Sequence, residues 1–313
     1  SHSGDRCFDT NQWDTDLHRD AYIGILKPRT ALIAGTGSGS VTGQVTMERY
    51  MASRLGYHYY SSPFTNAPIT EFTDELGTLT TGNPYINDDF NNNPNPFPNF
   101  FLYNEGRDVP FMNIGWEGAG ANLDIMRGYC INFGVSTTPL TTTVKNTALG
   151  PVNSGAYNFT VTHTTSSDPS ADGWNLVGNP YASPIDWLAT NGWTKANVDD
   201  AVYCFKPSTQ YAGTYTSFVG GVGTNDGSRY IASMQGFFVK AKISAGPSGA
   251  PFGVTNDVRI PALTSVFHKT LSNNPSLRLK GYNAANAIKA DETVIYFDPL
   301  ATFMFDSNLD AYK

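Results

Sequence analysis

Two pairs of adjacent carboxylates, Asp88-Asp89 and Asp199-Asp200, are the first residues that could serve a hydrolase. A glycosidase needs two carboxyl groups held about 5–10 Å apart across a cleft, one of them with a raised pKa. Successive side chains of a strand point to opposite faces, and both pairs stand in Asn-containing, turn-rich stretches. We therefore expect solvated loop carboxylates, and we expect Glu48, which precedes an arginine, to be a surface charge.

Other catalytic signatures are missing from the sequence. The glycine-rich run 35–40 lacks the Gly-Lys-Ser/Thr ending of a phosphate loop and the Gly-x-Ser-x-Gly spacing of a nucleophile elbow. No His-x-His or Cys-x-x-Cys pair suggests zinc. The histidines are scattered singly, at His2, His18, His58, His163 and His268. We predict that the chain is not an enzyme; the alternative is part of a secreted glycoside hydrolase.

Calcium requires only oxygen ligands, so it is harder to exclude. Asn87-Asp88-Asp89 could supply ligands from one loop, and Asp226 could do so from Asn225-Asp226-Gly227. The sequence Asn-Asp-Gly is also typical of an ordinary hairpin turn. We predict no obligatory cofactor and leave calcium at Asp88, Asp89 and Asp226 as an alternative.

Four aromatic residues expected in loops are candidates for ligand binding: Trp116, Trp193, Tyr211 and Tyr215. Sugar C–H groups stack on aromatic rings while sugar hydroxyls bond to neighbouring amides and carboxylates, so these residues could bind a glycan. Large rings are seldom fully buried in any case, so each of them could equally cap the end of a hydrophobic core.

Composition excludes several classes of partner. The formal net charge is −7, charged residues are 15%, and no Lys/Arg cluster is present, which disfavours nucleic acid and anionic membranes. No apolar run reaches the roughly 18 residues of a membrane span. The three cysteines do not make a disulfide framework. We expect Cys130 and Cys204 to be free and buried, with a bond among Cys7, Cys130 and Cys204 as the alternative.

The elements that must position these residues are strands. Segments such as 41–51, 157–163, 257–260, 276–280 and 293–297 alternate with period two, and no stretch sustains a helical period. The apolar run Gly173–Tyr181 ends on Gly-Asn-Pro, where a strand must stop, and Gly56–Phe64 has the same organisation. The fold class predicted is all-β.

The order of these segments is repeated along the chain. Residues 157–163, 201–205 and 234–239 correspond to 41–51, 100–103 and 126–131, which indicates duplication with loop insertions. We predict two tandem jelly-roll-like β-sandwiches, residues 41–150 and 151–313, preceded by an N-terminal arm and first strands over residues 1–40.

The run Trp174-Asn175-Leu176-Val177-Gly178-Asn179-Pro180, together with 45–63, 234–239 and 291–313, resembles a recurrent β-rich region of surface and secreted proteins of Bacteroidota. Proteins with this region typically leave the cell through the type IX secretion system. The resemblance covers about residues 41–313, implies an extracellular or outer-surface location, and implies no common catalytic motif.

These observations predict a non-catalytic cell-surface module that acts in adhesion or in assembly of a surface structure. The alternative is a carbohydrate-binding module of a secreted polysaccharide-degrading protein. The expected partners are a glycan or a second copy of the chain, because an exposed N-terminal arm allows strand addition between copies. Neither nucleic acid nor membrane insertion is expected.

Overall fold

The computed structural model describes residues 41, 43, 45–89, 91–107, 112–145, 151–260, 276–282 and 289–296. Strands account for 42% and helices for 10%, so the all-β class predicted from the sequence is confirmed. No helix in this described part has the length and hydropathy of a membrane span. The predicted arm and first strands, residues 1–40, lie outside the described residues. The jelly-roll connectivity and the two-domain boundary stay predictions.

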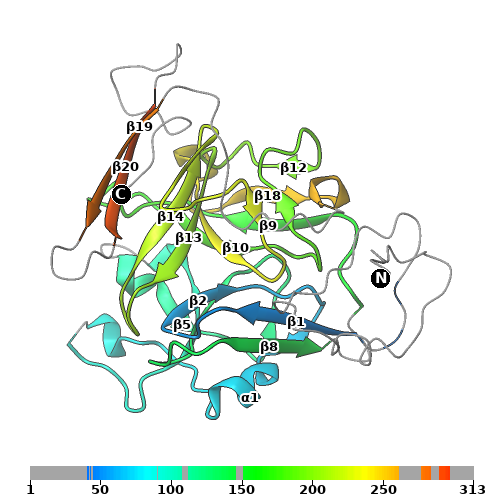
Figure 1. Ribbon diagram of the computed structural model, residues 1–313, viewed down its shortest axis with the longest axis vertical. Helices are drawn as coiled ribbons and strands as arrows, with labels where there is room; N and C mark the ends of the chain where they lie inside the picture. Colours follow the sequence, from blue (N-terminus) through cyan, green and yellow to red (C-terminus); the bar gives the residue numbers. More distant parts are fainter. Residues whose placement is uncertain are drawn as a thin grey trace, which may run out of the picture.

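The strands form sheets that fall into two groups along the chain (Figure 1). The first group contains β1 (Thr46–Met51) with β8 (Leu140–Lys145); β2 (Tyr57–Tyr60), β7 (Tyr129–Asn132), β4 (Phe100–Tyr103) and β5 (Trp116–Gly118) in that order; and β3 (Ala67–Pro68) with β6 (Asn122–Leu123). The second contains β10 (Trp174–Gly178), β17 (Gly236–Lys240), β13 (Ala201–Pro207), β14 (Gly213–Val219) and β15 (Val222–Thr224) in that order; β12 (Trp193–Thr194), β18 (Ala250–Val254) and β9 (Tyr157–Val161); and β11 (Ile185–Asp186) with β16 (Tyr230–Ile231).

The remaining elements are short helices and one hairpin. The helices are α1 (Thr73–Leu76), η2 (Ile69–Phe72), η3 (Ile86–Asp88), η4 (Glu105–Arg107), η5 (Met112–Gly115), η6 (Ile243–Ala245) and η7 (Asn256–Val258). Among the described strands, β19 (Ser276–Tyr282) pairs with β20 (Lys289–Tyr296) and with no other, so these two predicted strands form a hairpin and do not extend the described sheets of the second group.

The strand pairing of the first group recurs in the second. Tyr59 lies opposite Cys130 in β2 and β7, and Leu176 lies opposite Phe238 in β10 and β17. The pair β3–β6 matches β11–β16, and β1–β8 matches β9–β18. We call residues 46–145 the first repeat and residues 157–254 the second repeat.

The four main sheets are stacked in layers with three apolar clusters between them, and in Figure 1 the layers follow one another from β1–β8 at the bottom to β9–β18 at the upper right. Side-chain alternation on the inner strands explains this stacking. Tyr60 belongs to the cluster facing β1 and β8, whereas Tyr59 belongs to the central cluster between the repeats. Likewise, Val177 faces the outer sheet of the second repeat and Leu176 faces the centre.

Burial on both faces makes the inner strands mostly apolar instead of alternating. All residues of β7, β10 and β17 are buried. The Gly-Asn-Pro stop after β10 works through Asn179, whose side-chain amide donates to the carbonyl oxygens of Ser183 (2.8 Å) and Ala232 (2.9 Å) and whose Oδ1 accepts from the Tyr181 N–H. A buried amide with these partners carries no desolvation penalty for an unmade bond.

One predicted strand is wrong. Residues 257–260 alternate like a strand, but the chain forms η7 there, because the Thr255 side chain accepts a hydrogen bond from the Asp257 N–H at 3.3 Å and starts a turn. Such local capping outweighs a short alternating pattern.

Candidate binding site

The hairpin β13–β14 of the second repeat extends across β2 of the first repeat (Figure 1). The loop at its tip lies directly on the first repeat, because the Asn132 side-chain amide donates to the Gln210 carbonyl at 3.1 Å. Gly56 makes this contact possible: its φ is +71°, and a Cβ there would lie 2.4 Å from the Thr209 carbonyl oxygen. Both repeats therefore contribute to the surface around this loop.

Tyr59 of β2 is the centre of the contact between the repeats. Its hydroxyl lies 2.8 Å from the hydroxyl of Tyr215 in β14. Its ring centroid lies 6.1 Å from that of Trp116 and 5.7 Å from that of Phe205. Tyr59 itself is 4% exposed, so it supports rings that lie further out.

A second set of rings continues from Tyr57. Its centroid lies 6.3 Å from that of Tyr211 and 6.3 Å from that of Phe101, and Phe101 lies 6.1 Å from Phe97. Phe101 is buried, whereas Tyr211 is 64% exposed and Phe97 is 38% exposed. We define the aromatic patch as Tyr57, Phe97, Trp116, Tyr211 and Tyr215, which are connected through Tyr59 and Phe101.

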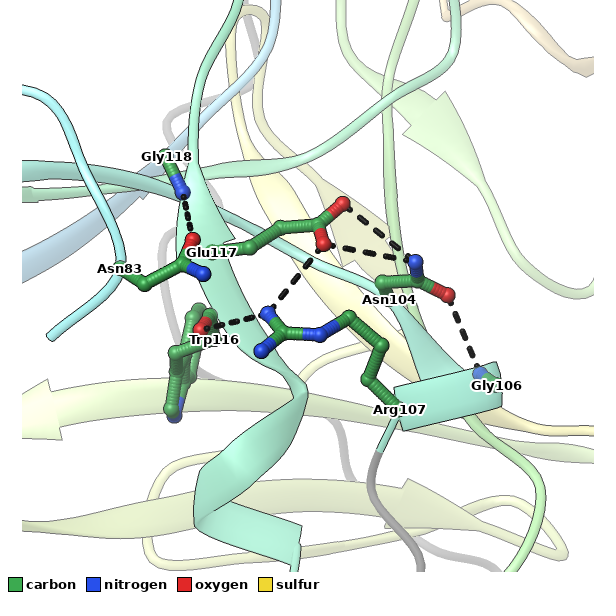
Figure 2. Close-up of polar contacts among 7 residues, drawn as sticks. All are labelled: Asn83, Asn104, Gly106, Arg107, Trp116, Glu117 and Gly118. Atoms are coloured by element: carbon green, nitrogen blue, oxygen red, sulfur yellow. Dashed lines mark hydrogen bonds and ion pairs between the residues drawn. The ribbon is translucent and has the colours of Figure 1, made fainter. Parts of the chain in front are cut away.

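A group of polar side chains lies at β5, the edge strand of its sheet, on the side of the strand away from the Trp116 ring (Figure 2). Arg107 lies 3.3 Å from the carboxylate of Glu117, with both side chains 26% exposed, and also donates to the Trp116 carbonyl at 3.5 Å. Asn104 donates to the same carboxylate at 3.4 Å, and Asn83 accepts from the Gly118 N–H at 3.2 Å. These side chains bond to outward-facing backbone groups of β5, which holds the strand that carries Trp116.

Two tyrosine hydroxyls of the patch, those of Tyr57 and Tyr215, stay protonated. Burial raises the pKa of Tyr57 to about 12. Loss of solvent around its hydroxyl, which bonds to the buried Tyr59, raises the pKa of Tyr215 to about 12, although 44% of the residue is exposed. At neutral pH these groups therefore remain neutral donors and acceptors.

The predicted ligand-binding residues do not all gather here. Trp116, Tyr211 and Tyr215 belong to the patch, and Trp116 and Tyr215 lie in strands instead of loops. Trp193 lies elsewhere, in β12, where its indole N–H donates to the Asp186 carbonyl at 2.8 Å and its centroid is 4.9 Å from that of Trp187. Trp193 thus occupies the core-capping position that the sequence left open as its alternative.

The acidic candidates have other partners. Asn225 and Asp226 have φ of +51° and +73°, and the Gly227 N–H donates to the Thr224 carbonyl at 2.8 Å, so this segment forms a tight turn. Asp226 also lies 2.8 Å from Lys206. Asp89 accepts from the Asn91 N–H at 2.9 Å, and Asp88 is part of η3.

No group of three or more His, Cys, Asp or Glu side chains in the described ranges could hold a metal ion together. Calcium binding stays a prediction.

The two Asp pairs differ from the sequence expectation in one respect. Asp200 is partly exposed and pairs with Lys195 at 2.5 Å, but Asp199 is 6% exposed, so the expectation of a solvated carboxylate at Asp199 is wrong. Its backbone N–H donates to the Lys240 carbonyl, which draws this residue into the second repeat. Glu48 is exposed, as expected.

Cys130 and Cys204 are both free, and burial raises the pKa of each thiol. Cys130 is buried and Cys204 is half-buried. Cys7 lies outside the described residues.

Sequence reasoning missed Tyr57, Phe97 and the polar side chains around Glu117. The sequence signal for the two rings would have been the high aromatic content of the strands that are buried on both faces and of the segments beside them. Which ring reaches the surface depends on the packing of one repeat on the other.

The fold and the patch define a layered all-β protein with a composite, ring-lined candidate binding surface. Residues 25–313 match the family described as Domain of unknown function (DUF8693), and the chain belongs to this family. Neither the comparison with curated proteins nor the comparison with solved structures gives a match.

Proposed function

We propose that this chain is a non-catalytic module of an exported protein at the outer cell surface, and that it acts in adhesion or surface assembly by binding through the aromatic patch. One observation carries the proposal. Trp116 of the first repeat and Tyr211 and Tyr215 of the second come together where the two repeats meet, and two of them are 64% and 44% exposed.

Exposed rings of this kind are informative because they are costly to leave in water. Apolar surface contributes about 25 cal/mol per Å² when it is buried, and clustered exposed rings mark interaction sites more often than scattered ones do. Aromatic anchors also dominate binding energy at interfaces. The rigid support from Tyr59 and Phe101 means that the rings are held in place before a ligand arrives.

A second function is favoured by a polar group beside the patch. The exposed ring of Tyr211 directly follows Gln210, whose carbonyl accepts from the Asn132 side-chain amide, so a stacking surface and a directional hydrogen-bonding group lie together. This combination suits a carbohydrate-binding module of a secreted polysaccharide-degrading protein. The two roles share the patch and differ in ligand: a polymer on a cell surface for adhesion, a soluble or particulate polysaccharide for the module.

The test is binding of the labelled chain to whole bacterial cells and to arrayed polysaccharides. Tyr211→Ala removes the most exposed ring of the patch, and Tyr282→Ala removes a ring of 59% exposure on β19, outside both repeats, as the matched control. We expect at least about tenfold weaker binding for Tyr211→Ala only, equivalent to 1.4 kcal/mol. Equal binding by both variants, or no binding to any surface, contradicts the proposal.

Assembly by strand addition through residues 1–20 remains a separate prediction. Light scattering of the chain with and without these residues tests it, and a strict monomer in both cases refutes it.

A further inference from the structure

We infer that the aromatic patch binds an internal stretch of an uncharged, extended polysaccharide chain. The inference rests on the binding role proposed above and names the ligand class of the same surface. Its grounds are the shape of the row of rings, the exposure of both ends of that row, and the charge of the groups beside it.

The rings form a row with nearly equal steps. Going from Tyr211 to Tyr57, Phe101 and Phe97, successive centroids are 6.3, 6.3 and 6.1 Å apart. Neighbouring rings are tilted by 54°, 55° and 60°, so the ring faces turn along the row. Phe101 is 3% exposed, so it supports the row from below and a ligand meets Tyr211, Tyr57 and Phe97. An extended ligand made of repeating units can reach all three rings, whereas a compact ligand reaches one or two.

Both ends of the row are open to solvent. Tyr211 at one end is 64% exposed and Phe97 at the other is 38% exposed. A pocket that recognises a chain terminus encloses it on one side, but here a chain can extend past either terminal ring. This favours binding within a polymer over binding at its end.

The groups that border the row are mostly neutral. Asn132, which lies opposite Tyr57 in the pairing of β2 with β7, donates its side-chain N–H to the Gln210 carbonyl at 3.1 Å. The charged pair of Arg107 and Glu117, 3.3 Å apart, lies on the side of β5 away from the Trp116 ring (Figure 2). With a net charge of −7, the chain repels an acidic polymer, so a neutral polysaccharide fits better.

Calorimetry with neutral oligosaccharides tests the inference. The probes are xylo-, cello- and manno-oligosaccharides, each as a disaccharide, a tetrasaccharide and a hexasaccharide, with oligogalacturonides of the same lengths as acidic comparators. We expect one neutral series to bind, with affinity rising at least about tenfold from disaccharide to hexasaccharide as further rings are engaged. Phe97→Ala and Tyr211→Ala, at opposite ends of the row, should each remove most of that gain, and Tyr282→Ala should not.

The outcomes separate the two proposals. Equal affinity for short and long oligosaccharides, preference for the acidic series, or a length gain that both end variants retain overturns the inference. If no oligosaccharide binds while the chain still adheres to cells through Tyr211, the inference fails and the proposed function stands. If oligosaccharides and cells are both left unbound, both fail.

Discussion

Ser61 and Gly178 lie against each other at the same position of the two repeats. The Ser61 N–H donates to the Met234 carbonyl at 3.2 Å, and the Gly178 N–H donates to the Met126 carbonyl at 2.8 Å. The flanking bridges Tyr60 to Gln235 and Arg127 to Val177 show the same reciprocal exchange. The repeats therefore meet across an approximate two-fold axis, and each completes the strand edge of the other.

This relationship predicts that Gly178→Ala is destabilising. A Cβ at Gly178 would lie 2.2 Å from the Cβ of Ser61 and 2.9 Å from the Arg127 carbonyl oxygen, both in the buried contact. We expect a loss of about 1–3 kcal/mol in the free energy of unfolding, measured with urea. Gly120→Ala is the control, because nothing lies within 4 Å of its Cβ position. The exchange Ser61→Gly with Gly178→Ser should recover most of the loss; if it is as unstable as Gly178→Ala, the two-fold relationship is not energetically equivalent.

The hydroxyl pair of Tyr59 and Tyr215 gives a second prediction. Tyr215→Phe leaves the buried Tyr59 hydroxyl without the 2.8 Å partner it has now, which should cost about 1 kcal/mol of unfolding free energy. Replacing both tyrosines by phenylalanine removes donor and acceptor together and should be closer to neutral. Thermal and urea unfolding of Tyr59→Phe, Tyr215→Phe and the double variant measure the coupling. Additive losses in the double variant would show that the pair contributes nothing as a pair.

A buried carboxylate predicts a third effect. Glu105 of the first repeat is 3% exposed, and its Oε1 accepts from the backbone N–H groups of Thr164 and Gly173 in the second repeat. Its Oε2 accepts from the Thr164 hydroxyl at 3.0 Å. Glu105→Ala leaves these N–H groups unpaired and should cost about 2–4 kcal/mol. Glu105→Gln retains one acceptor oxygen and can donate to the hydroxyl, so it should cost much less. Equal unfolding midpoints for wild type and Glu105→Ala would exclude this link between the repeats.

His58 predicts a dependence of stability on pH. Burial, followed by the positive charge of Arg49, lowers its pKa from 6.5 to about 4, and its Nε2–H donates to the Leu55 carbonyl at 3.1 Å. Between these values the unfolded chain binds the proton and the folded chain does not. Stability should therefore fall as the pH drops from 6.5 to about 4, by on the order of 3 kcal/mol.

The control for this prediction is His58→Gln, which keeps a donor and cannot titrate. The unfolding free energy of the wild type relative to that of His58→Gln should fall as the pH drops from 6.5 to about 4, and it should be constant above that window. A difference that is constant from pH 7 to about pH 4 would show that His58 does not contribute to acid sensitivity.

The fold class and the order of repeated segments could be predicted from the sequence, because strand periodicity and the Gly-Asn-Pro stop are local signals. Gly56 and Gly173 illustrate this. Both have positive φ, +71° and +77°, and the backbone carbonyl of each accepts a hydrogen bond from the chain segment that returns beside it. Residues 257–260 show the limit of such signals, since one capping side chain reversed the expectation there.

The sequence alone determined the alternation of apolar residues along the strands and the positions of the turns, since each depends on residues close together in the chain. It also determined the duplication, since the same local patterns recur in the same order. The tertiary structure decided which aromatic rings are exposed. Trp193 and Tyr211 both follow turn-rich sequence, yet Trp193 packs against Trp187 while Tyr211 reaches solvent beside Tyr57. The reason is that exposure depends on how the second repeat's hairpin lies across the first repeat, a contact between residues more than a hundred positions apart.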